Sequence, residues 1–229
     1  VFALVILTFV RWVDQIARLG RLGNTIERAE EAAARAIRAR RREPRLGGAP
    51  MAALSPHAVT VDSVQVGYVC EVDLALLEDI AGEQGLVLAL DALPGRFVSS
   101  GQPLLRLDAA GAATDTALPA RLRRAFRITP CREFEADPRF GLVVLSEIAG
   151  RALSPAVNDP GTAIDVTGRL VRLFDLWCHT LPAEPAAPPR FSRVRVPELA
   201  PRALVEDAFT AIARDGAGSI EVMCRLLKG

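Results

Sequence analysis

Hydrophobic and polar positions follow different periods in successive parts of the chain. Residues 1–10 (VFALVILTFV) are uniformly apolar, and residues 14–42 lack proline and place apolar side chains every three to four positions, which predicts a helix. β-Branched residues alternate from residue 57 onward, which predicts strands. From residue 137 the helical period returns. The pattern predicts an α+β chain: a stalk helix, a small β-rich module and a helical subdomain.

The apolar decamer predicts the end of a transmembrane helix over residues 1–13. Ten residues cover about half of a hydrocarbon core, and Trp12 suits the interfacial region. The alternative is a buried strand or core helix. The chain starts with Val1, so we expect a longer polypeptide. Arginines follow at positions 11, 18, 21, 28, 35, 38, 40, 41, 42 and 45. By the positive-inside rule, the rest of the chain is then cytoplasmic, at a bacterial inner membrane.

Residues 14–50 predict a basic stalk helix and a linker. Ile16, Leu19, Ile26 and Ile37 have heptad-like spacing, and such a seam packs on another helix or on the chain's own β module. We therefore expect a homo-oligomer, with ordinary core packing as the alternative. The arginine face would contact anionic headgroups of the bilayer or be solvated. The helix should end at Pro44, Gly47, Gly48 and Pro50.

Residues 51–110 predict the β-rich module, interrupted by a short helix over 73–82 with Asp73 as its N-cap. Residues 94–105 contain two glycine turns between short apolar runs. This rhythm resembles barrel-sandwich hybrids such as lipoyl, biotinyl and membrane-fusion adaptor domains. No lysine occupies the hairpin, which excludes a swinging-arm carrier. We expect a barrel-sandwich-like module.

Residues 111–229 predict the helical subdomain. Asp137-Pro138 and Asp159-Pro160 each place an N-cap aspartate before a proline, a favoured helix start. The two helices should extend to Leu153 and to about His179. A proline-rich loop (182–189), a strand (191–196) and a helix over 201–227 broken near 216–218 should follow.

The amino-acid composition argues against several classes of partner and of catalytic chemistry. The chain has 28 basic and 27 acidic residues and 5% aromatic residues, which argues against a nucleic-acid partner. Lys228 is the one lysine, which excludes most lysine chemistry. The four cysteines form no C-x-x-C pair, so we expect buried or half-buried free thiols and no metal or other cofactor.

The densest polar cluster flanks the turn between the two Asp-Pro helices: Arg151, Ser154, Asn158, Asp159 and Thr162. These residues would bind an anion at the helix start or simply cap the two helices. Glu147 is expected to pair with Arg151 along the helix. The chain has no G-x-S-x-G, H-E-x-x-H or Gly-rich phosphate loop, and only two histidines. No catalytic residue is assigned.

The run from Asp137 through Phe140, Glu147 and Asn158 to Ala163 resembles the signature of a bacterial family of predicted membrane proteins, domain of unknown function 2254. Gly67-Tyr68-Val69 and Pro94-Gly95-Arg96-Phe97-Val98 match it as well. The resemblance implies several preceding transmembrane helices and no established activity. The family pattern has Arg-Thr where this chain has Arg132-Glu133, and glutamine where it has Cys70. Both departures argue against a polar site there.

Three functions are compatible with these features. The first is a non-enzymatic cytoplasmic module that assembles or gates a channel or transporter. The second is a membrane-surface enzyme, which would have a deep polar pocket around Arg151 and Asp159. The third is a lipid- or peptide-binding adaptor, which would have an apolar groove on the β module. The predicted end of a transmembrane helix and the basic stalk helix that follows it favour the first of these functions.

Overall fold

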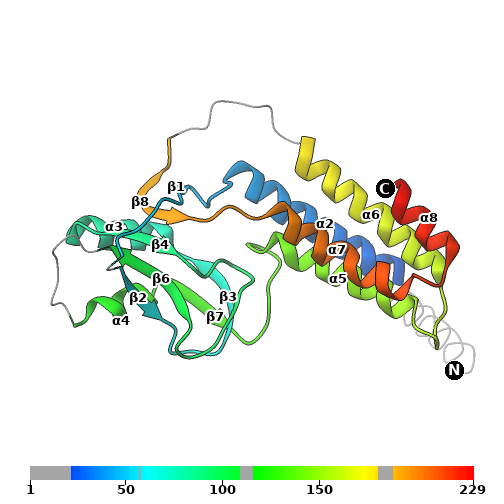
Figure 1. Ribbon diagram of the computed structural model, residues 1–229, viewed down its shortest axis with the longest axis horizontal. Helices are drawn as coiled ribbons and strands as arrows, with labels where there is room; N and C mark the ends of the chain where they lie inside the picture. The colour runs from blue at the N-terminus through cyan, green and yellow to red at the C-terminus, as the bar shows by residue number, and fades with distance from the viewer. Residues whose placement is uncertain (1–21, 57, 109–115, 180–187) are drawn as a thin grey trace, which may run out of the picture.

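The computed structural model describes residues 22–56, 58–108, 116–179 and 188–229, with two β-sheets at one end and a helical bundle at the other (Figure 1). The apolar decamer, Trp12, Ile16, Leu19 and His57 lie outside the described residues, as do most positions of the proline-rich loop. None of the helices in these ranges is both long and apolar enough to cross a bilayer.

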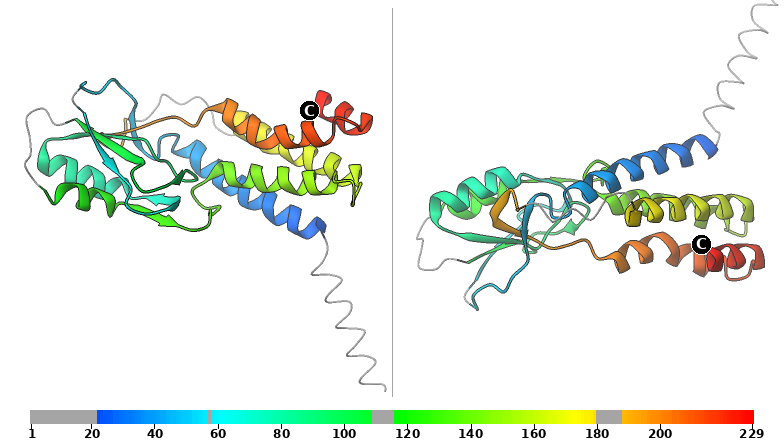
Figure 2. Two further views of the ribbon diagram at one scale, coloured as in Figure 1. Left: turned by 60° about the horizontal axis from the view of Figure 1, so that its bottom comes forward. Right: turned by 90° about the horizontal axis from the view of Figure 1, so that it is seen from above.

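The bundle contains five helices: α2 (Leu22–Arg42), α5 (Pro138–Ala152), α6 (Pro160–His179), α7 (Pro201–Asp215) and α8 (Ile220–Lys228). Helix α2 packs against α5 and α6, and α5 also packs against α7. Small side chains permit the α2–α5 approach, because a Cβ added to Gly141 would lie 2.9 Å from Cα of Ala33. Figure 2 shows the helices side by side along the long axis.

The apolar face of α2 belongs to the core of this bundle. Ile26 and Ile37 are 3% and 2% exposed and lie in one hydrophobic cluster with residues of α5, α6 and α7. The described half of the predicted seam is therefore covered by the chain's own helices, not by the β module. Since Ile26 is core, a charge at this position would test folding instead of subunit contact.

The larger sheet has five strands in the order β1-β8-β4-β6-β2. They are β1 (Gly48–Pro50), β8 (Phe191–Val196), β4 (Val87–Leu90), β6 (Pro103–Asp108) and β2 (Val59–Asp62). Strand β8 is parallel to both β1 and β4, whereas β6 is antiparallel to β4 and β2. Strand β8 thus brings residues from beyond α6 into the sheet.

The smaller sheet has three antiparallel strands in the order β5-β3-β7, namely β5 (Phe97–Val98), β3 (Gly67–Val72) and β7 (Phe126–Thr129). No closed barrel forms from the described strands, so the barrel-sandwich expectation is wrong. The reason is that the two strands of the predicted hairpin separate. Strand β5 joins the three-stranded sheet, and β6 joins the five-stranded sheet.

Local signals predicted the helix starts well. Asp73 accepts from the Leu76 amide at 2.9 Å and caps α3 (Leu74–Gln84), which packs against β8. Asp137 likewise caps α5. The break between α7 and α8 falls at the predicted glycines. A further short helix, α4 (Leu118–Arg123), precedes β7.

Candidate functional site

The predicted polar corner lies at the end of the bundle farthest from the sheets, between α5 and α6 (Figures 1 and 2). Asp159 accepts from the Thr162 amide at 3.1 Å and from its hydroxyl at 2.6 Å, and these bonds lower the pKa of Asp159. Asn158 has a φ of 48°, in the left-handed region that Asn tolerates. The Ser154 hydroxyl donates to the Arg151 carbonyl at 2.7 Å. Ser154, Asn158, Asp159 and Thr162 therefore shape a tight helix-to-helix turn.

The Arg151 side chain does not take part in this turn. It is exposed, and no hydrogen bond or ion pair joins it to another described residue. Glu147 is also exposed, and the expected ion pair with Arg151 does not form. The contacts of this corner are those of helix capping, and an anion site here stays a prediction.

A different polar cluster occupies the junction between the sheets and the bundle. Its centre is Asp137, which is 3% exposed. The Arg132 guanidinium donates to one carboxylate oxygen at 2.8 and 2.6 Å, and the amides of Arg139 and Phe140 donate to the other at 3.0 and 3.3 Å. Burial raises the pKa of Asp137, whereas Arg132 and the two amides act in the opposite direction.

Two further residues close around this carboxylate. Gly95 has a φ of 93°, and a Cβ there would lie 2.5 Å from Cγ and 2.7 Å from Oδ1 of Asp137. Arg40 from the end of α2 is 4% exposed and donates to the Ala136 carbonyl at 3.2 Å. Burial lowers the pKa of Arg40, and attraction to Asp137 opposes this effect. The glycine at 95 thus lets the sheet region approach the capped start of α5.

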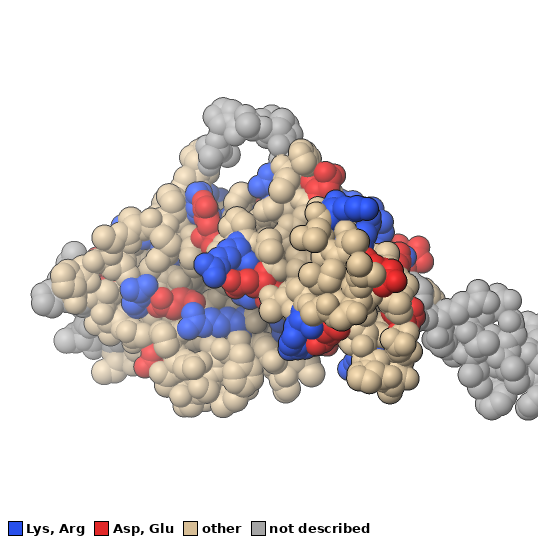
Figure 3. Space-filling model, turned by 45° about the vertical axis from the view of Figure 1, so that its right-hand side comes forward, with Lys and Arg blue, Asp and Glu red and all other residues tan. Residues whose placement is uncertain are grey.

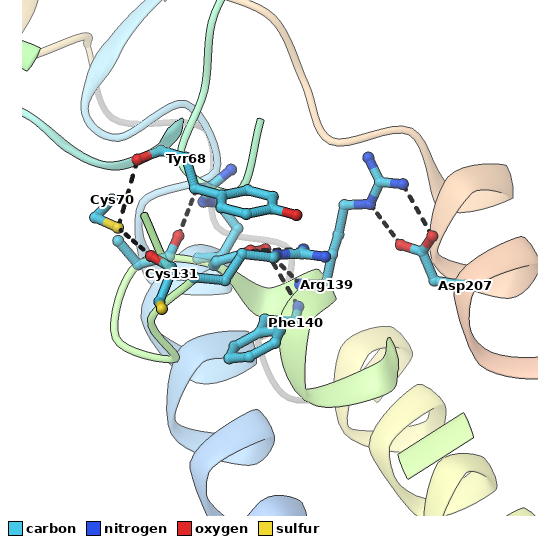
Figure 4. A network of polar contacts seen from close by, with 10 residues as sticks. Tyr68, Cys70, Cys131, Arg139, Phe140 and Asp207 are labelled. Atoms are coloured by element: carbon cyan, nitrogen blue, oxygen red, sulfur yellow. Dashed lines mark hydrogen bonds and ion pairs between the residues drawn. The ribbon is translucent and has the colours of Figure 1, made fainter. Parts of the chain in front are cut away.

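The cluster continues toward both neighbours, as Figure 4 shows. On the sheet side, the Cys70 thiol lies 3.0 Å from the Thr129 hydroxyl and 3.3 Å from the Cys131 carbonyl. On the bundle side, Arg139 donates to both oxygens of Asp207 on α7 at 2.5 and 2.9 Å. The Cys70 contacts join β3 to β7 and to the residues that follow it, and the Arg139–Asp207 pair joins α5 to α7.

The two positions where the chain departs from the family pattern both lie in polar contacts. Cys70 belongs to the contacts around Cys131, and Glu133 binds Arg127 through two hydrogen bonds of 2.7 Å. The Glu133 and Glu71 carboxylates raise the pKa of Arg127. The departures therefore do not remove polar contacts from these positions, and their weight against a polar site stays a prediction.

Two cavities stand out in the described part of the chain. A polar cleft of about 290 Å³ at the junction is lined by Arg40, Asp91, Arg96, Asp137, Arg139 and Glu198 among others. An apolar groove of about 670 Å³ lies between α6, α7 and α8, and its lining includes Phe174, Phe209, Met223 and Leu226. Neither includes Arg151 or Asp159, and the apolar groove is on the bundle rather than on the β module.

The other candidate groups are dispersed. Cys70 is buried, but Cys131, Cys178 and Cys224 are exposed free thiols, so the expectation of burial is wrong for these three. Within the described ranges, no group of three or more His, Cys, Asp or Glu side chains is arranged to hold a metal ion. On the face drawn in Figure 3, acidic and basic side chains lie next to one another and form no continuous basic patch.

Comparison with known proteins gives a family for the whole chain. The family model described as "Predicted membrane protein (DUF2254)" matches residues 1–229. The chain belongs to this family. The resemblance that the Asp137–Ala163 run indicates is thereby confirmed. As a member of this family, the chain is part of a predicted membrane protein.

Mycobacterial proteins provide the curated relatives of this family member. The chain is 35% identical over 120 residues to uncharacterized protein Rv1290c of Mycobacterium tuberculosis and, over the same length, to uncharacterized protein Mb1321c of Mycobacterium bovis. The match covers 51% of this chain and 22% of each relative, so the chain spans a minor part of their length. No solved structure is significantly similar to the chain.

Sequence reasoning identified Asp137 as a cap but missed the cluster around it. Arg40 stood in a run of stalk arginines, and Gly95 stood in a turn. The Asp-Pro pair is a local signal, whereas Arg40 and Asp137 are 97 positions apart and meet only through the packing of α2 on α5. The glycine in the predicted Pro94-Gly95 turn was a local sign of a close approach, and the structure gives it a positive φ.

Proposed function

We propose that residues 22–229 form a non-enzymatic cytoplasmic module of a multi-pass bacterial membrane protein, with a role in its assembly or gating. The observation that carries the proposal is the direction of α2. Its first residue, Leu22, lies at the bundle end that also carries the α5–α6 and α7–α8 turns, and the sheets lie at the opposite end (Figures 1 and 2). The chain preceding Leu22 contains the apolar decamer.

The connections between bundle and sheet support a mechanical role. Helix α2 leads into β1, and β8 leads into α7. Strands β1 and β8 are parallel neighbours, with Ala49 opposite Arg195 and Pro50 opposite Val196. Because α2 is also buried against α5 and α6, a displacement of the chain before Leu22 would move the bundle and pull directly on the sheet.

Membrane orientation is tested with the exposed thiols. Single-cysteine variants that retain Cys131 or Cys224 would be treated with a membrane-impermeant maleimide in intact spheroplasts and in inverted vesicles. We expect labelling only in inverted vesicles, since both thiols would face the cytoplasm. Buried Cys70 is the control and should label only after denaturation. Labelling of Cys131 or Cys224 in intact spheroplasts would refute the cytoplasmic placement.

Assembly is tested by sedimentation of the full-length protein in detergent. We expect the intact protein to be an oligomer, and we expect the number of subunits to fall when residues 22–229 are deleted. A monomer for the intact protein would refute the assembly role. Ile26 should be left unchanged in such work, because it is core.

A further inference from the structure

The polar cleft at the junction is built from four separate segments. Its walls come from the end of α2, the connection between β4 and β5, the start of α5 and the connection between β8 and α7. These segments belong to both the sheet region and the bundle. A molecule bound there would therefore contact both parts.

The acidic residues of the wall already have basic partners outside it. Asp137 pairs with Arg132. Asp91 accepts from Arg106 at 2.9 Å through both oxygens, and Glu198 pairs with Arg45. None of these three arginines lines the cleft. The acidic side chains of the wall are thus paired with arginines that lie outside the cleft.

The basic residues of the wall are not neutralised in the same way. Arg139 is paired with Asp207, but Arg40 and Arg96 have no carboxylate within ion-pair distance among the described residues. Arg40 makes one hydrogen bond, to the Ala136 carbonyl, and Arg96 donates to the Asp91 carbonyl at 2.6 Å. The cleft therefore has two arginines that form no direct ion pair with a described carboxylate, although Asp137 attracts Arg40.

Arg40 is the more informative of the two because it is buried. A buried guanidinium without an ionic partner is costly. Its Nε and Nη1 atoms have no described hydrogen-bond partner. In the described ranges, the side-chain polar atoms that are fully buried without a hydrogen-bond partner are Arg41 Nε and Ser146 Oγ. Nε and Nη1 of Arg40 are not among them, so these two atoms are not fully buried. Arg40 is also one of the residues that line the cleft.

The start of α7 forms part of the same wall, through Ala200 and Ala203. Its first residue, Pro201, has no N–H, and the Ala203 amide donates to the Ala200 carbonyl at 3.0 Å. What this helix of 15 residues offers the cleft is therefore the positive end of its dipole, which favours an anion. At the neighbouring start of α5, the Asp137 carboxylate already occupies the corresponding position.

We propose that this cleft binds a small oxyanion, the phosphate group of a water-soluble molecule, between Arg40, Arg96 and the start of α7. Its volume of about 290 Å³ suits inorganic phosphate or a small phosphate monoester. Arg40 lies about 27 Å along α2 from Leu22, at about 1.5 Å per residue. If the chain before Leu22 enters the membrane, as the proposed function has it, this separation favours a soluble phosphate over a lipid headgroup. The choice of phosphate source rests on the proposed function, whereas the anion site itself does not.

The test is calorimetric titration of the purified protein in neutral detergent with inorganic phosphate. We expect saturable binding to the parent protein. Arg96→Ala and Arg40→Gln should each weaken it about tenfold or more, the effect of losing a charge-assisted hydrogen bond. The matched control is Arg38→Ala, an exposed arginine on the same helix that does not line the cleft; its affinity should stay within about twofold of the parent.

Three results would overturn the proposal. The parent protein could show no saturable phosphate binding. Arg38→Ala could weaken binding as much as Arg96→Ala, which would indicate a diffuse charge effect. In a second arm with detergent micelles containing phosphatidic acid, Arg96-dependent binding to the lipid but not to free phosphate would assign the site to a headgroup. If Arg40→Gln fails to fold, Arg96→Ala still decides, because its side chain is exposed.

Discussion

Replacing Gly95 by alanine tests whether the junction depends on the close approach of the β4–β5 connection to Asp137. The added Cβ meets the Asp137 carboxylate, at 2.5 Å from Cγ and 2.7 Å from Oδ1. Asp137 cannot retreat without leaving Arg132 or the two amides that it caps. The substitution should therefore separate the sheet region from the bundle.

The magnitude follows from two contributions. A residue other than glycine at a φ of 93° costs about 1–2 kcal/mol. Displacing Asp137 disrupts a partly buried ion pair whose complete loss would cost about 3–5 kcal/mol. Because the Arg132 side chain is 18% exposed and can partly follow, we expect about 3–5 kcal/mol for the total loss in unfolding free energy.

Two other glycines separate these contributions. Gly101 has a φ of 84° but no atom within 4 Å of an added Cβ, so Gly101→Ala should cost only about 1–2 kcal/mol. Gly82 lies within α3 and is also unobstructed, so Gly82→Ala should stabilise by about 0.5–1 kcal/mol. The assay is equilibrium urea unfolding followed by circular dichroism. If Gly95→Ala costs no more than Gly101→Ala, the steric argument is wrong.

Two further changes test the bundle. Asp159→Ala should lower the melting temperature by about 2–4 °C through loss of the α6 cap, whereas Asp159→Asn keeps one acceptor oxygen and should lower it less. Because the folded-state pKa of Asp159 is lowered, its ionised cap stabilises above the unfolded-state pKa of about 3.9. The gap between parent and Asp159→Ala should narrow as the pH falls through the folded-state pKa, and a gap of unchanged size at low pH would contradict this. Gly141→Ala should lower the free energy of unfolding by about 1–3 kcal/mol, because the added methyl group overpacks against Ala33. If urea unfolding gives Gly141→Ala the same free energy of unfolding as Gly82→Ala, α2 and α5 can separate freely.

The helices could be predicted because their signals are local. A capping aspartate specifies a helix start within four residues, and Asp73, Asp137 and Asp159 all act as caps in the structure. The apolar stripe of α2 was also visible, but its partner was not. The same stripe of isoleucine and alanine would pack equally well on a second subunit, and only the small residues Ala33 and Gly141 make the intramolecular fit specific.

The sheets and the junction could not be predicted because they depend on contacts between residues far apart in the sequence. Strand β8 pairs with β1 and β4, which precede it by more than a hundred positions, and nothing in its six residues specifies these neighbours. The polar cluster depends on that pairing, because the connection from β8 to α7 forms one wall of the cleft. A buried arginine in a run of exposed ones has no local signature.

The position of the cleft relates the two proposals physically. An anion held by Arg40, Arg96 and the start of α7 would contact α2, the sheet region and α7 together, and these are the elements that β1 and β8 connect. Binding to this arrangement alone would stabilise it by mass action, by about 2.7 kcal/mol when phosphate is present at one hundred times its dissociation constant. Phosphate should therefore raise the melting temperature of the parent and of Arg38→Ala. It should have little effect on Arg96→Ala or on Gly95→Ala, in which the wall of the cleft is displaced.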